Sequence, residues 1–95
     1  MPGKYEPLEL YLRAVSDKKN EITLSFTDVE RIIGAKLPAS AMAHQAWWGN
    51  QRDTRNRPQA HAWLSAGFRV DMVNQNGANA SVRFIRRTKD SLQNP

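Results

Sequence analysis

The sequence predicts an α+β domain with three or four helices, a small antiparallel sheet and a C-terminal β-hairpin. Two observations lead to this fold class. Apolar residues recur at helical spacing in some segments, whereas residues 21–26, 68–73 and 80–87 alternate apolar and polar side chains as strands do. The segments also follow one another as helix, strand, helices and hairpin, which makes the predicted fold winged-helix-like.

The length and composition indicate one domain. Ninety-five residues suffice for a single hydrophobic core, so we expect one domain over residues 1–95, ordered from about residue 4 to residue 88. No apolar run approaches the roughly 20 residues of a membrane helix, and no secretion-signal core follows the start. The absence of cysteine excludes disulfides and thiolate metal sites. We therefore expect a cytoplasmic protein without membrane contact.

The first two elements follow from apolar spacing. Leu8 and Leu12 lie on one face of a predicted helix over residues 6–15. Leu24 occupies the middle of a predicted strand over residues 21–26, in which every second side chain is apolar.

The next helix is predicted from the stretch TDVE, residues 27–30, which has the pattern of a capping box. In such a box the Thr27 hydroxyl accepts from the amide of Glu30, and the Glu30 carboxylate accepts from the amide of Thr27. Gly34 then ends the helix, because glycine readily takes the left-handed conformation of a helix C-terminus.

Two further helices complete the helical part. One begins at Pro38 or Ser40 and runs to residue 48. The other begins at Pro58, since proline suits the first turn of a helix, and it is closed by Gly67.

The C-terminal part is predicted to be a hairpin. Phe68, Val70 and Met72 fall on one face of the first strand. The pair Asn76-Gly77 favours a turn, after which residues 80–87 return as the partner strand. The tail from residue 88 has no periodicity and is expected to be frayed.

Five stretches resemble a small bacterial and phage domain family of unknown function: KYEPLELYL, ITLSFTDVERIIGAKLPASA, HQAWWGN, QAHAWLSAG and VRFIRR. The resemblance covers about residues 4–87. Members of that family stand alone or are appended to larger proteins, which implies a recognition module and brings no catalytic residue. The resemblance also implies a basic residue at the position of Met42. A phosphate contact there is then missing, or it is supplied by the arginine-rich loop.

Positive charge is distributed unevenly along the chain. Residues 1–35 contain five basic and six acidic residues, whereas residues 36–95 contain nine basic and three acidic ones. The second segment therefore has a balance of +6. Such asymmetry indicates a face that attracts a polyanion, most often nucleic acid.

All three tryptophans flank an arginine-rich loop over residues 51–57. Trp63, in an alanine-rich helix, is expected in the core. Trp47 and Trp48 are consecutive and point about 100° apart on a helix, so we expect one in the core and the other exposed. An exposed indole beside arginines would stack on a base or pack on a sugar.

The predicted nucleic-acid contacts combine phosphate-binding arginines, base-reading amides and exposed side chains of the third helix. For each arginine, a solvated surface charge is the alternative. The predicted contact residues are Ser40, His44, Trp48, Asn50, Arg52, Arg55, Arg57, Gln59, Arg83, Arg86 and Arg87.

These observations predict a non-catalytic nucleic-acid-binding module of a bacterial, plasmid or phage protein, with DNA ahead of RNA and no cofactor or metal. His44 and His61 are 17 residues apart and have no companion ligands, and no phosphate loop or nucleophile elbow is present. One alternative is a protein-interaction module that binds and modulates a host complex through an exposed tryptophan. A small nuclease is the less favoured alternative. The oligomeric state is left open.

Overall fold

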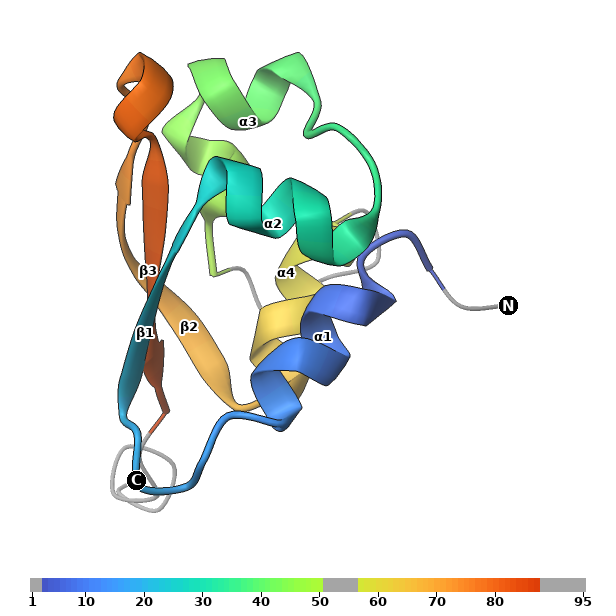
Figure 1. Cartoon of the computed structure of the whole chain (residues 1–95), viewed down its shortest axis with the longest axis vertical. Helices are drawn as coiled ribbons and strands as arrows, with labels where there is room; N and C mark the ends of the chain where they lie inside the picture. Colours follow the sequence, from blue (N-terminus) through green and yellow to red (C-terminus); the bar gives the residue numbers. More distant parts are fainter. Residues whose placement is uncertain (1–2, 51–56, 88–95) are drawn as a thin grey trace.

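The structure is a computed structural model that describes residues 3–50 and 57–87 (Figure 1). It has the predicted α+β class, with four α-helices, a small sheet and a C-terminal hairpin. The helices are α1 (Glu6–Arg13), α2 (Phe26–Ile33), α3 (Ala39–Ala43) and α4 (Pro58–Ser65). The strands are β1 (Glu21–Ser25), β2 (Phe68–Asn74) and β3 (Ser81–Arg86). Two short 3₁₀ helices are η1 (Gln45–Trp48) and η2 (Gly77–Asn79).

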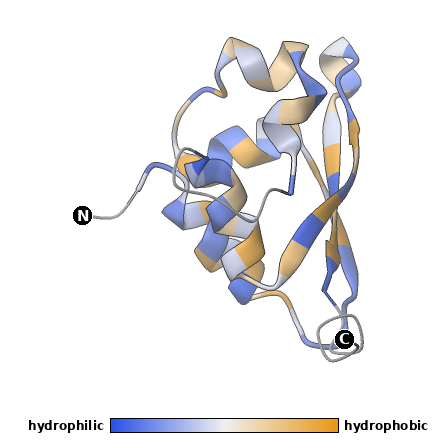
Figure 2. Cartoon of the chain, turned by 180° about the vertical axis from the view of Figure 1, so that it is seen from behind, coloured by the Kyte–Doolittle hydropathy of each residue, from blue (hydrophilic) through white to orange (hydrophobic). Residues whose placement is uncertain are grey.

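The three strands form one antiparallel sheet in the order β1-β3-β2. Figure 1 shows the helices on one side of this sheet, and hydrophobic and hydrophilic positions alternate along the strands in Figure 2. The last strand therefore occupies the centre of the sheet. Its inward side chains, Val82 and Phe84, are fully buried.

A column of aromatic rings fills the space between the sheet and the helices. Phe26 stacks on Trp48 at 5.0 Å between ring centroids, and Trp48 stacks on Trp63 at 5.8 Å. Phe84 of the sheet lies 5.7 Å beyond Trp63. Because a buried aromatic side chain removes about 150–250 Å² from water, this column accounts for much of the core. The prediction that Trp63 is a core residue is confirmed.

Helix α2 is capped two residues earlier than predicted. Its N-cap is Ser25, whose hydroxyl accepts from the Asp28 amide at 2.9 Å, while the Asp28 carboxylate accepts from the Ser25 amide at 3.1 Å. Thr27 therefore lies inside the helix, and the predicted Thr27 cap is wrong. The Glu30 carboxylate instead accepts from the Leu37 amide at 2.8 Å, so it secures the loop that follows the helix.

The predicted third helix is two short helices. The chain leaves α3 at His44, whose extended backbone (φ −126°, ψ 117°) breaks the helix before η1 begins. The helix ends predicted at Gly34, Pro58 and Gly67 are confirmed, whereas α1 ends at Arg13, two residues before the predicted end. Gly34 and Gly67 have φ of +70° and +87°, and Pro58 opens α4.

Strand β2 contains an irregularity that reverses one predicted side chain. Val70 faces Phe84 and Met72 faces Arg83, so one residue of β2 is unmatched between them. After such a bulge, the alternation of side chains changes face. Met72 is therefore 62% exposed, contrary to the prediction that it shares the buried face of Phe68.

Candidate functional site

Trp48 is a core residue. Its side chain is 2% exposed, and its indole Nε1 donates to the Ala41 carbonyl at 2.9 Å. Its neighbour Trp47 is half-buried and meets Trp48 edge-on, with 4.7 Å between ring centroids. The prediction that Trp48 is available to stack on a base is wrong, because the column already occupies its faces.

The two amides predicted to read bases are engaged within the domain. Asn50 donates to the Val70 carbonyl and accepts from the Val70 amide, both at 2.8 Å, and it also accepts from Trp63 Nε1 at 3.0 Å. Gln59 is buried and donates to the Trp47 carbonyl at 3.2 Å. The predicted base-reading role is contradicted for Gln59, which is buried, whereas it stays a prediction for Asn50, which is exposed.

Two of the predicted arginines already have partners. Arg57 donates from Nη1 to the Ala46 carbonyl at 3.1 Å. Arg83, in the central strand, forms ion pairs with Glu21 of β1 and, at 3.7 Å, with Asp71 of β2. Hydrogen bonding and attraction to Glu21 raise the pKa of the Arg83 guanidinium above its ordinary value. Arg83 therefore joins the three strands and contributes little net positive charge.

Arg86 and Arg87 lie where β3 ends and hold backbone carbonyls. Arg86 donates to the carbonyls of Ser16 and Lys19 at 3.0 and 3.1 Å, and its guanidinium lies 4.6 Å from the Phe68 ring centroid. Arg87 donates to the Leu64 carbonyl at 3.4 Å. Both arginines are part-exposed, and their charges stay at this end of the sheet without an acidic partner among the described residues.

Ser40 and His44 are exposed on the α3 segment, and Figure 1 shows α3 at the opposite end of the sheet from the end of β3, where Arg86 and Arg87 lie. Arg52 and Arg55 lie outside the described residues, as does the tail predicted to be frayed. The predicted site therefore does not assemble as one surface within residues 3–50 and 57–87.

The structure does bring together basic residues that the sequence analysis had separated. Arg86 contacts the turn between α1 and β1, and Arg69 at the start of β2 is opposite Ile85 of β3. We call this surface the basic end. It consists of Lys18, Lys19, Arg69, Arg86 and Arg87.

At the opposite end of the molecule, two segments of the described chain carry no charged side chain of their own. Residues 37–50 and 72–82 contain no Lys, Arg, Asp or Glu. Figure 1 shows α3 beside η2 at the top of the view, and the Gln75 amide donates to the Ala41 carbonyl at 2.9 Å between them. We call the surface of α3 and the β2–β3 connection the uncharged end; η1 is left out of it because the Arg57 guanidinium donates to the Ala46 carbonyl.

A family model described as a domain of unknown function, DUF7662, matches residues 5–88. The chain belongs to this family. The predicted resemblance to a family of unknown function is thereby confirmed. No curated protein and no solved structure matches the chain.

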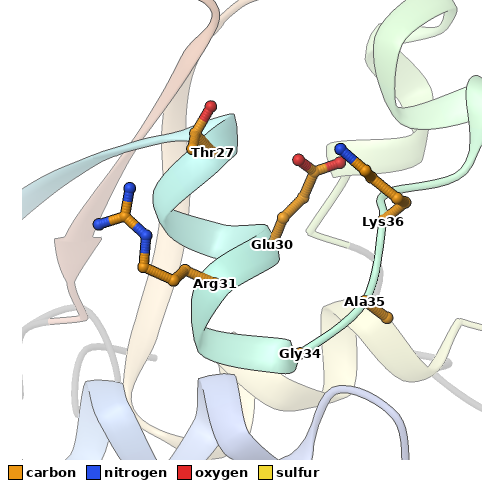
Figure 3. A pocket seen from close by; sticks show the side chains of 6 residues that line it. All are labelled: Thr27, Glu30, Arg31, Gly34, Ala35 and Lys36. Carbon is orange, nitrogen blue, oxygen red and sulfur yellow. The ribbon is translucent and has the colours of Figure 1, made fainter.

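This DUF7662 domain also has a shallow cavity beside α2 (Figure 3). Arg31 projects from one flank of the helix, while Glu30 and Lys36 point toward each other on the other flank. Because the Glu30 carboxylate lies between the two basic side chains, the cavity does not present charge of one sign. Thr27, Gly34 and Ala35 complete its lining.

The described part of the DUF7662 domain offers neither a metal site nor a membrane-spanning helix. Residues 3–50 and 57–87 bring no three metal-ligating side chains together. None of the helices described there has the length and apolar character needed to cross a membrane.

Proposed function

We propose that this DUF7662 domain is a non-catalytic module that binds nucleic acid, DNA ahead of RNA, through the basic end. The observation that carries the proposal is the gathering of five basic side chains from three separate segments at one end of the sheet. Two acids, Asp17 and Glu21, lie in the same region, and Glu21 is paired with Arg83. The basic end therefore keeps a net positive charge.

The basic side chains have different tasks in this proposal. Arg86 fixes the turn through carbonyl contacts, so its charge is held at a set position. Lys18, Lys19 and Arg69 are exposed and can reach phosphates. Such contacts hold a nucleic acid by its backbone and convey no sequence information. We therefore propose binding with little sequence preference.

In a winged helix the hairpin would contact the nucleic acid, but the hairpin of this domain does not have that role in our proposal. The turn between β2 and β3 belongs to the uncharged end, so it offers no phosphate contact from a charged side chain. The order of helix, strand, helices and hairpin supports the comparison with a winged helix. The positive charge, however, supports nucleic-acid contact at the basic end, which lies opposite the β2–β3 turn. A cytoplasmic location is part of the proposal and rests on the absence of cysteine.

The salt dependence of binding tests the proposal. Affinity for duplex DNA, single-stranded DNA and RNA oligonucleotides would be measured over a range of salt concentrations. Replacing Lys18 and Lys19 together by Ala should flatten the plot of log affinity against log salt by about 0.9 for each lost contact with duplex phosphate.

A matched control removes the same charge elsewhere. Lys4 and Lys36 are exposed and lie in other segments, so their double replacement by Ala should leave the slope nearly unchanged. Equal slopes for the two double variants would exclude the basic end as the contact. No binding of any oligonucleotide by the wild type at low salt would exclude the function itself.

Protein binding is the second candidate function. The uncharged end favours it, because the centres of protein–protein interfaces are depleted of charged residues and enriched in Met and aromatic ones. Its exposed side chains include Met42, which is 42% exposed.

A further inference from the structure

Nucleic-acid binding at the basic end gives no role to the uncharged end. Two segments, residues 37–50 and 72–82, together make 25 residues without a charged side chain. Since 24% of the chain is charged, about six charges would be expected in this number of residues. The fold places α3 of the first segment beside the β2–β3 connection of the second, so among the described residues the lack of charge belongs to a surface and not to one stretch of sequence. The Arg57 guanidinium reaches the first segment at Ala46 of η1, outside this surface.

This surface is polar and firmly held. The His44 amide donates to the Ser40 carbonyl at 2.9 Å, and the Asn79 amide donates to the Asn76 carbonyl at 3.0 Å. The hydrogen bond from Gln75 joins the two segments. Hydroxyl, amide, imidazole and thioether side chains are exposed on it, and they are Ser40, Met42, His44, Asn76 and Asn79.

We propose that the uncharged end binds the uncharged end of a second copy of this chain, which gives a symmetric dimer. In a two-fold dimer the same surface meets itself and must be self-complementary. Amides and hydroxyls both donate and accept, so an amide-bearing surface can form hydrogen bonds with its own copy. Ammonium and guanidinium groups only donate and repel their own copies.

The net charge of the chain also favours a second copy as the partner of the uncharged end. Each chain has a formal net charge of +5, so two copies repel each other through any face that carries the excess positive charge. The uncharged end lets them approach without placing like charges in contact. In the resulting dimer the two basic ends point away from the contact, although dimerisation itself does not depend on their binding nucleic acid.

The area of the uncharged end limits the affinity of the proposed dimer. The two shorter dimensions of the molecule are 29 and 24 Å. An end of this size presents on the order of 500 Å² per copy, less than the about 800 Å² that a stable interface of standard size takes from each partner. The dimer is therefore weak and dependent on protein concentration.

Analytical ultracentrifugation of the full chain, from low micromolar to near-millimolar concentration, tests this inference. The wild type should pass from monomer to dimer, with little effect of salt. Ala43→Lys, at an exposed position of α3, places like charges in the contact and should weaken association about tenfold or more. Ala14→Lys makes the same change at the exposed end of α1 and should leave association unchanged.

Charge reversal provides the sharper test. Ala43→Glu should also dissociate, and an equal mixture of the Ala43→Lys and Ala43→Glu chains should form a heterodimer that salt weakens. Ser40→Lys is the replacement for Ala43→Lys if the latter lowers the melting temperature.

Three results would overturn the inference. They are a wild type that stays monomeric throughout the concentration range, an Ala43→Lys chain that dimerises like the wild type, or mixed variants that do not associate. If the wild type is monomeric, a different protein becomes the candidate partner of the uncharged end.

Discussion

The two ends of the molecule hold polar groups of opposite kinds. At the basic end, the Arg86 guanidinium at the end of β3 donates to carbonyls of the turn between α1 and β1, and Arg87 donates to the Leu64 carbonyl of α4, so distant parts of the chain are joined by charged side chains. At the uncharged end, the joining hydrogen bond comes from the neutral amide of Gln75. Each end has thus gained order through internal hydrogen bonds, but only the basic end keeps a charge that acts on solvent and ligands over a distance. In our proposals, long-range attraction of nucleic acid acts at the basic end, and short-range complementarity with a second copy acts at the uncharged end.

The largest loss of stability is expected from a substitution in the hydrophobic core, because the core supports both the basic end and the uncharged end. Trp48→Ala should lower the free energy of unfolding by about 3–5 kcal/mol, because it removes a buried ring from the middle of the aromatic column. Urea melts would measure the loss. In this variant nucleic-acid binding and dimerisation should weaken together. Met72→Ala also removes a large apolar side chain, but an exposed one, and should cost less than about 0.5 kcal/mol.

An intermediate effect is expected at the start of α2, which is part of neither end. Ser25→Ala removes the N-cap hydroxyl and should cost about 1 kcal/mol in denaturant melts. Thr27→Ala deletes a similar hydroxyl at an exposed helical position and is the matched control. A larger loss of unfolding free energy for Thr27→Ala than for Ser25→Ala would support the capping box predicted from the sequence and contradict the Ser25 cap.

The smallest effect is the coupling between the ends. The free energy of dimerisation lost by Ala43→Lys should be the same in the wild type and in the Lys18→Ala/Lys19→Ala chain, within about 0.5 kcal/mol, because distant sites without shared partners behave additively. Ultracentrifugation of the four chains completes this cycle. A larger interaction energy would mean that the two ends do not act separately.

The secondary structure was largely predictable because its signals are local. Apolar spacing placed α1 and β1, and proline and glycine marked α4 and α2 at their ends. The errors arose where local signals competed. TDVE fits the capping pattern, but Ser25 leaves β1 with an extended backbone and starts the helix first. In β2 the unmatched residue after Val70 altered the alternation, and the sequence shows no sign of it.

The candidate site was less predictable because its contacts are not local. Asn50 and Gln59 are polar residues beside a basic loop in the sequence, yet their amides bond to backbone groups across the fold. Arg86 and Arg87 of the basic end were predicted as contacts, but Lys18, Lys19 and Arg69 were missed for the same reason. Lys19 and Arg86 are 67 residues apart, and they meet because β3 pairs with β1. Testing the antiparallel pairing of residues 21–25 with residues 81–85 would have placed these charges together.

Asn50 has one further consequence, for how the sheet ends. Strand β2 is an edge strand, and its Val70 would offer an amide and a carbonyl to any other strand. Asn50 takes both groups, with a donor and an acceptor arranged as in a peptide unit, while Trp63 Nε1 fixes the orientation of its amide. Exposed edges invite pairing with other chains, and proteins commonly blunt them with charges, prolines or bulges. Here the Asn50 side chain makes the two hydrogen bonds that a residue of a fourth strand would make with Val70, so it blocks strand pairing at this position of β2.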